Sequence, residues 1–128
     1  MKRQIVYWLN SAKHDLQVAE TLFQNEKYDW CLFIAHLVLE KSLKACCVKY
    51  KDAFPPRTHD LVRLINLAGL TLDEETLDFL DTVNSFNIST RYPDEKFKFY
   101  KMCTREFTIE NFSRIKEIHK WVLKMIRS

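Results

Sequence analysis

The feature that most constrains this sequence is its single glycine, Gly69, in 128 residues. An average protein of this length would contain about nine glycines. Glycine-rich phosphate loops, dinucleotide-binding fingerprints and tight two-residue hairpins all need glycine at fixed positions. With few glycines and only three prolines, the sequence favours helices with short polar connections over an α/β nucleotide-binding fold or a β-sandwich.

The length of the chain fits one helical domain spanning residues 1–128. No apolar run approaches the roughly 18–20 residues of a membrane span, and the N-terminal residues lack the apolar core of a signal peptide. We therefore expect a cytoplasmic protein that does not enter a membrane. The four cysteines include no C-x-x-C pair, and we expect them to be small buried apolar side chains rather than disulfides or metal ligands.

Charge is distributed unevenly along the chain, whose formal net charge is +3. Residues 69–90 carry five acidic side chains and no basic one, whereas residues 91–128 carry ten basic and five acidic side chains. A basic C-terminal third is compatible with a phosphate-bearing partner. It is equally typical of a solvated lysine-rich helix.

Apolar residues at three- and four-residue steps predict an amphipathic helix from Ile5 to about Gln24. A second helix, apolar on nearly every side, is expected to be capped by Asp29 and to end before Pro55-Pro56. A third helix is predicted to begin at Thr58 and to end at Gly69, since glycine suits the left-handed position after a helix.

A capping box from Thr71 to Glu74 predicts the start of a fourth helix. Residues 86–96 are predicted to form one long polar connection, and residues 97–107 a short helix or a packed lead-in. The last helix is expected to be capped by Thr108. The predicted fold class is therefore all-α, an antiparallel up-and-down bundle of four to five helices.

The spacing of the histidines excludes the metal sites that helical bundles commonly hold. A di-iron site needs Glu three positions before His on two helices, but those positions hold Ser11, Phe33, Pro56 and Lys116. No His-Glu-x-x-His motif and no nucleophile elbow occurs. We expect no metal and no cofactor, and we interpret His36, within an apolar helix, as a hydrogen-bonded core histidine.

Two groups of polar residues are candidates for binding phosphate. Lys41 and Lys44 follow the most apolar segment, although Glu40 and Lys44 also have the spacing of an ordinary helix-surface pair. Arg91 and Tyr92 precede a proline, and a guanidinium beside a phenol suits phosphate and base recognition. The alternative is an arginine that caps carbonyl groups and a tyrosine that covers the end of the bundle.

Four segments in order resemble the HEPN domain family, which consists of small prokaryotic helical bundles often encoded beside minimal nucleotidyltransferases. The segments are Trp8 to Ala19, Tyr28 to Ala45 with its ending Glu40-Lys41-x-Leu43-Lys44-Ala45, Pro56 to Leu64, and Arg91-Tyr92-Pro93. The resemblance implies a homodimer that binds a nucleotide or RNA, or that pairs with a nucleotidyltransferase subunit. The binding residues it suggests are Lys41, Lys44, His59, Arg91 and Tyr92.

Many HEPN proteins are metal-independent endoribonucleases with an Arg-x4–6-His motif, in which arginine holds the phosphate and histidine assists proton transfer. No histidine follows Arg91 until His119, so we expect a non-catalytic module. Arg114 and His119 have the spacing of the motif, but on one helix they would point about 140° apart.

Two alternatives to the non-catalytic module stay open. One is an endoribonuclease toxin of a toxin–antitoxin pair, using Arg91 or Arg114 with His119 or His59. The other is a structural helical adaptor. The sequence contains no DNA-binding motif.

Overall fold

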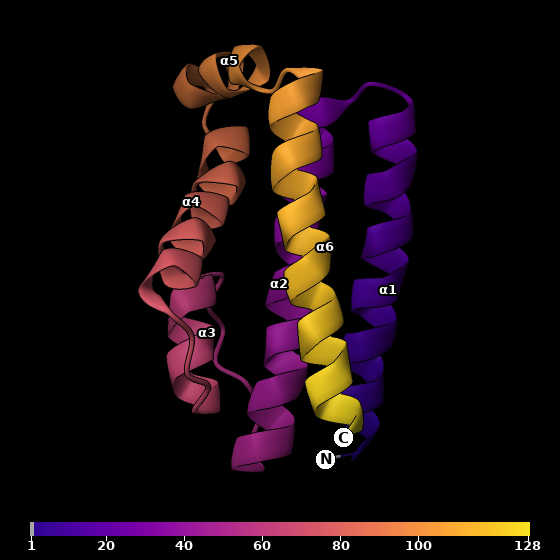
Figure 1. Ribbon diagram of the computed structural model, residues 1–128, viewed down its shortest axis with the longest axis vertical. Coiled ribbons are helices and arrows are strands. Elements are labelled where there is room, and N and C mark those ends of the chain that lie inside the picture. The colour runs from indigo at the N-terminus through magenta and orange to yellow at the C-terminus, as the bar shows by residue number, and fades with distance from the viewer. Residues whose placement is uncertain (1) are drawn as a thin grey trace.

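The computed structural model describes residues 2–128, and these form six helices and no strand (Figure 1). The helices are α1 (Lys2–Gln24), α2 (Tyr28–Lys51), α3 (Leu61–Ala68), α4 (Glu74–Arg91), α5 (Pro93–Met102) and α6 (Arg105–Arg127). The all-α class predicted from the sequence is confirmed. The number of helices exceeds the predicted four or five because α5 is a separate helix.

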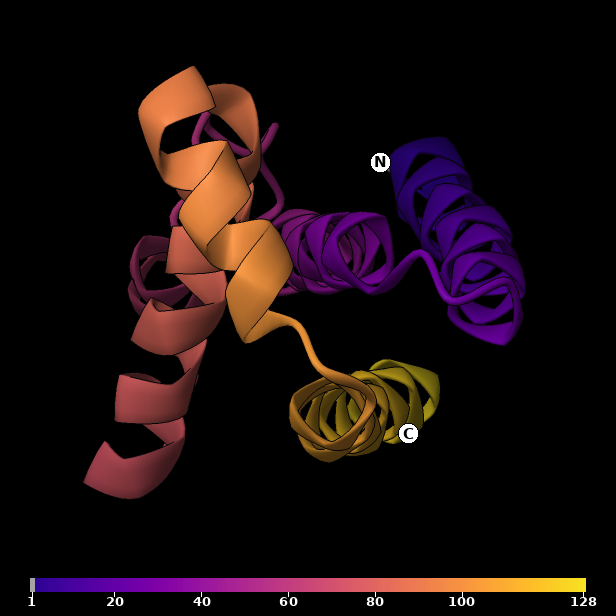
Figure 2. The ribbon, with the colours of Figure 1, turned by 90° about the horizontal axis from the view of Figure 1, so that it is seen from above.

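Helix α2 lies at the centre of the fold. In the end-on view of Figure 2 it is surrounded by α1, α6 and the pair formed by α3 and α4, and it packs against each of them. Because α2 has neighbours on nearly every side, it buries side chains all round, as its apolar sequence predicts. Its largest fully buried side chains are Leu32, Leu39, Leu43, His36 and Val38.

Two helix starts differ from the predicted ones because a different side chain caps the first turn. In α3 the cap is Asp60, whose carboxylate accepts from the backbone N–H groups of Val62 and Arg63 in the first turn, so Thr58 lies outside the helix. In α6 the Thr104 hydroxyl accepts from Phe107 N at 3.2 Å. Thr108 was expected to be this cap, but only Thr104 has the extended backbone that a cap requires.

Helices α2 and α4 also start at residues other than those predicted. Asp29 lies inside the first turn of α2, where a carboxylate suits the helix dipole, and Lys27 precedes the helix. In α4 the cap position is Asp73, so Thr71 of the expected capping box stays outside the helix. Gly69 ends α3 with φ 75°, and its N–H donates to Asn66 O, as predicted.

The long polar connection predicted for residues 86–96 is wrong. Helix α4 continues to Arg91, α5 begins at Pro93, and only Tyr92 between them is extended. The cause is tertiary packing, because Phe86 is fully buried and its ring lies 5.4 Å from that of Phe99 on α5. Pro93 suits the first position of a helix, where no N–H is needed.

The four cysteines are free and buried, as expected. Burial raises the pKa of the Cys31, Cys46 and Cys103 thiols to about 12, so they stay protonated. Within residues 2–128, no helix combines the length and the apolar character that crossing a membrane requires. The same residues contain no group of three or more side chains placed to hold a metal ion.

Candidate functional site

A buried carboxylate on α2, that of Glu40, organises the main polar cluster of the molecule. Its Oε1 accepts from His59 Nδ1 at 2.8 Å, and its Oε2 accepts from Lys44 Nζ at 2.9 Å. Glu40 and Lys44 are one helical turn apart, while His59 comes from the connection that leads to α3. Since a carboxylate only accepts, the Nδ1 atom of His59 carries the hydrogen. We call Glu40, Lys44, His59 and His36 the Glu40 cluster.

The charge of Glu40 is stabilised despite its burial. Burial alone would raise the pKa of the carboxyl, but the hydrogen bonds and positive charges of Lys44 and His59 outweigh it and lower the pKa below its ordinary value. Glu40 is therefore ionised at neutral pH and balances the buried ammonium of Lys44.

His36 is fully buried one turn before Glu40 and connects three elements. Its Nε2 lies 2.9 Å from the carbonyl oxygen of His59, so Nε2 carries the hydrogen and donates it. Its Nδ1 accepts from Asn87 Nδ2 of α4 at 3.4 Å. Burial lowers the pKa of His36, which keeps the ring neutral. The expected hydrogen-bonded core histidine is confirmed, and it holds the backbone of His59 in place.

One opening beside the Glu40 cluster is a pocket of about 260 Å³ that we call the α4 pocket. It is lined by His59, Asp60, Asp81, Asn84, Asn87 and Ile88. The side chain of His59 is 56% exposed. Because its Nδ1 is bound to Glu40, its Nε2 is the ring nitrogen available to a ligand.

Arg91 and Tyr92 lie at the C-terminal end of α4 and are both exposed. The positions Asp81, Asn84, Ile88 and Arg91 follow steps of three and four residues, so they share one face of α4. Arg91 therefore extends the face that lines the α4 pocket, about 10 Å beyond Asn84 along the helix axis.

A second opening lies where Lys44 of the Glu40 cluster meets α1. Lys44 Nζ is 5.2 Å from the ring centroid of Trp8, and both residues line a pocket of about 470 Å³ that we call the Trp8 pocket. Lys41 points elsewhere, since its Nζ forms an ion pair with Asp15 of α1 at 2.7 Å. The structure thus gives the two predicted lysines separate carboxylate partners.

Arg114 and His119 lie on α6 and contact different neighbours. The Arg114 guanidinium lies over the ring of Phe79 on α4, 3.9 Å from its centroid. His119 is 3% exposed and lines a pocket with Leu16 and Glu20 of α1. Burial, and then the positive charge of Arg127, lower the pKa of His119. Within one protomer the two side chains are not brought together.

The sequence interpretation missed Asn87 as a site residue and did not assign Asn84 a role. Asn84 Oδ1 accepts from Leu61 N at 3.0 Å, and its Nδ2 donates to Asp60 Oδ1 at 2.9 Å. Asn87 was placed in a loop, so its register with His36 was hidden. A helical reading of residues 84–91 would have put both asparagines near the face of Arg91.

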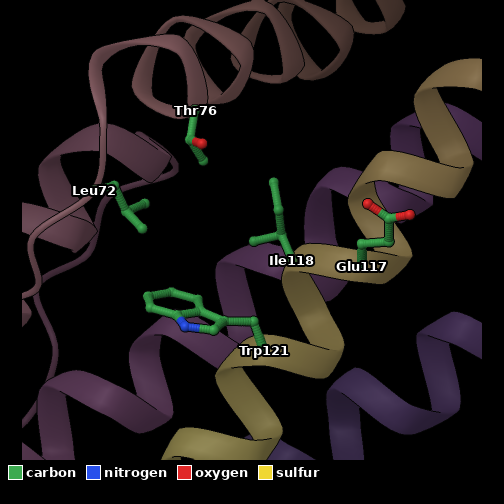
Figure 3. A pocket seen from close by; sticks show the side chains of 5 residues that line it. All are labelled: Leu72, Thr76, Glu117, Ile118 and Trp121. Carbon is green, nitrogen blue, oxygen red and sulfur yellow. The ribbon is translucent and has the colours of Figure 1, made fainter.

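A third opening is of a different kind. Figure 3 shows Ile118 and Trp121 of α6 pointing toward Leu72 and Thr76. This cleft has a volume of about 230 Å³, and its five lining residues include Glu117 but no basic side chain. Its lining is mainly apolar, so it lacks the groups that bind phosphate.

Comparison with known proteins gives two matches. A family model described as the HEPN domain matches residues 5–126. The crystal structure of TT1696 from Thermus thermophilus is similar to this chain with a TM-score of 0.77 and 23% sequence identity, and the similarity covers 94% of this chain and 97% of that one. At this identity the likeness shows the fold alone. No curated protein matches the chain.

Proposed function

This chain belongs to the HEPN domain family, and on that premise we propose that it is a non-catalytic module that binds a nucleotide or RNA. We propose further that it acts as a homodimer with a nucleotidyltransferase partner. The absence of a histidine four to seven residues after Arg91 supports a binding role over a catalytic one. The proposed contact residues are His59, Arg91, Tyr92 and Lys44, while Lys41 is already bound to Asp15.

The observation that carries this proposal is the orientation of His59 by the buried Glu40 carboxylate at 2.8 Å, at one end of the face that leads to Arg91. Glu40 occupies Nδ1 of His59, which leaves Nε2 as the ring nitrogen that can contact a phosphate. The guanidinium of Arg91 can bind a second phosphate in a bidentate manner, and Tyr92 offers a ring for base stacking.

The spacing along α4 favours a single strand of RNA over one nucleotide on this face. Asp60, next to His59, is hydrogen-bonded to Asn84, which is about 10 Å from Arg91 along the helix. Two phosphates of a strand can occupy the two ends. Between them lie Asn87 and Ile88, and the amide of Asn87 suits ribose and base groups better than phosphate. Asp81 lies on the far side of Asn84 from Arg91.

Binding of a short single-stranded RNA, measured by fluorescence anisotropy at low salt, tests this proposal. We expect Arg91→Ala and His59→Ala each to weaken binding about tenfold or more, because each removes a hydrogen bond to a charged group. Arg127→Ala is the control, since Arg127 is the last residue of α6 and the C-terminal end of that helix lies opposite α5 (Figure 1). No binding by the wild type, or equal binding by all variants, contradicts the proposal.

The Glu40–His59 pair also favours a second function, metal-independent cleavage of RNA. A carboxylate bound to Nδ1 orients an imidazole so that Nε2 can exchange a proton with a substrate. Cleavage of RNA by the wild type in the presence of EDTA, lost in His59→Ala and Arg91→Ala, would support an endoribonuclease. If His119→Leu, and not His59→Ala, abolished such cleavage, the Glu40–His59 pair would be excluded as its source.

The proposed partner contacts are supported by α5, which leaves large apolar side chains uncovered. Phe97 is 61% and Tyr100 62% exposed, and exposed apolar patches are typical of interaction surfaces. Sedimentation of the full chain measures its oligomeric state and so tests the homodimer. The double variant Phe97→Ser, Tyr100→Ser is expected to shift the equilibrium from dimer toward monomer. A wild type that is monomeric at high concentration contradicts the dimer.

A further inference from the structure

The Trp8 pocket is built by three parts of the chain that are distant in sequence. Helix α1 contributes Gln4, Tyr7 and Trp8, helix α2 contributes Lys44, and the connection to α3 contributes Phe54, Pro55, Pro56 and Arg57. Its volume of about 470 Å³ lies within the range of about 300–1,000 Å³ typical of small-ligand sites. None of the residues that form the α4 pocket lines it.

Two aromatic rings that line the Trp8 pocket are largely exposed. Tyr7 is 63% and Phe54 71% exposed, and they come from α1 and from the connection that faces it. Trp8 forms a T-shaped pair with Tyr7, with centroids 5.1 Å apart. Aromatic surfaces around an open volume favour a planar ring as the ligand, because planar rings stack on aromatic side chains.

The polar groups of the pocket specify the rest of the ligand. Gln4 Oε1 is buried and has no hydrogen-bond partner among residues 2–128, so a ligand donor would satisfy it. Two cations, Lys44 and Arg57, line the pocket and no acidic residue does. Lys44 is fixed by Glu40 Oε2 at 2.9 Å, so its ammonium is already positioned, and Arg57 adds a positive charge without a carboxylate of its own in the lining.

We propose that the Trp8 pocket binds a single nucleotide with a terminal phosphate. The base stacks on Trp8 and Phe54, an exocyclic amine of the base donates to Gln4 Oε1, and the phosphate binds Arg57 and Lys44. The site is distinct from the α4 face. It shares Lys44 and the chemistry of its ligand with the proposed function. Such a nucleotide is either free or the end of an RNA strand.

Calorimetric titration of the full chain with adenosine monophosphate tests the site. Adenine carries the exocyclic amine that Gln4 can accept, and we expect one nucleotide to bind per chain. Adenosine and ribose 5-phosphate, which lack the phosphate and the base respectively, are each expected to bind at least about tenfold more weakly. Arg57→Ala and Gln4→Leu are expected to weaken binding of the nucleotide by a similar factor, and Arg3→Ala, an exposed arginine of α1, is the control.

The three tryptophans provide a second readout that locates the ligand. In a proton–nitrogen NMR spectrum, the indole N–H signal of Trp8 is expected to shift on titration, while those of Trp30 and Trp121, which lie outside this pocket, stay in place. A 5′-phosphorylated RNA that shifts Trp8 when the free nucleotide does not would assign the pocket to an RNA end.

If neither adenosine monophosphate at millimolar concentration nor the 5′-phosphorylated RNA binds, the proposal is overturned. It is also overturned if Arg57→Ala binds the nucleotide as tightly as the wild type does. These results leave the α4 face untouched, because that face is tested by Arg91 and a strand without a terminal phosphate.

Discussion

Helices α2 and α6 pack against each other, and each buries one histidine in a different way. His36 of α2 has a partner for both ring nitrogens, one from the connection before α3 and one from α4. His119 of α6 has an Nδ1 without a hydrogen-bond partner among residues 2–128. Burial lowers the pKa of both, so burial alone does not distinguish them. The two histidines differ in their hydrogen bonds, because two other elements supply partners to His36.

The largest expected effect comes from removing the centre of the α2 network. Glu40→Ala leaves the buried ammonium of Lys44 without its counter-charge and His59 without its acceptor. Breaking a buried ion pair from one side typically costs about 3–5 kcal/mol of unfolding free energy. Urea denaturation measures this loss.

The matched control for Glu40→Ala is Glu20→Ala, which removes the partly exposed pair between Glu20 and Lys116 on α1 and α6. An exposed pair contributes about 0–1 kcal/mol. If both variants lost the same stability, the Glu40 cluster would be no more than an ordinary surface pair. If Glu40→Leu combined with Lys44→Met regained the lost stability, the penalty would be traced to the unpaired charge.

Local patterns explain which parts of this fold could be predicted from sequence. The apolar periodicity of α1, the apolar character of α2 on nearly every side and the glycine at the end of α3 depend on neighbouring residues. All three were predicted correctly. The continuation of α4 to Arg91 depends on Phe86 packing against Phe99. That contact lies between helices, and no local pattern shows it.

The candidate site follows the same rule. Glu40 and Lys44 share a helix and their contact was weighed from spacing alone, whereas the bonds of His59 to Glu40 and of Asn87 to His36 join residues far apart in sequence. The spacing of Lys41 and Lys44 suggested a common phosphate site. It could not show that Asp15 of α1 lies within 2.7 Å of Lys41.

A smaller effect is expected from His36→Leu, which keeps the burial and removes the hydrogen bonds. The carbonyl oxygen of His59 and the amide of Asn87 would each lose a partner, for a loss of about 1–3 kcal/mol. His36→Gln, which retains a donor, is expected to recover part of it. Thermal unfolding compares the three proteins. If His36→Leu were as stable as the wild type, the hydrogen bonds of His36 would contribute no more to stability than the surroundings of His119 do.

The smallest effect at neutral pH is expected from His119→Leu. Because Nδ1 of His119 has no partner among the described residues, replacing the ring by an apolar side chain of similar size removes no hydrogen bond at that atom. We expect its unfolding free energy to stay within about 1 kcal/mol of the wild type at about pH 7.5. The same substitution at His36 would cost more, so the two leucine variants measure the difference between the two histidines directly.

Lowering the pH should reverse the order of His119→Leu and the wild type. The folded-state pKa of His119 lies below the ordinary value of 6.5, so below about pH 6.5 the unfolded chain binds the proton and the folded chain does not. The unfolding free energy of the wild type therefore falls as the pH falls, by up to about 1.4 kcal/mol per pH unit for this group.

His119→Leu removes this contribution and keeps that of His36, so it should be the more stable protein at about pH 5.5, with a shallower pH dependence. Glu40 does not mask the effect. Its lowered pKa preserves its stabilisation until the pH falls below its ordinary value of 4.5. Denaturation midpoints of the wild type and of His119→Leu, measured between about pH 7.5 and pH 5, test this difference in pH dependence. Parallel curves for the two proteins would mean that His119 takes up its proton without leaving the folded state, and the contrast between α2 and α6 would then rest on hydrogen bonding alone.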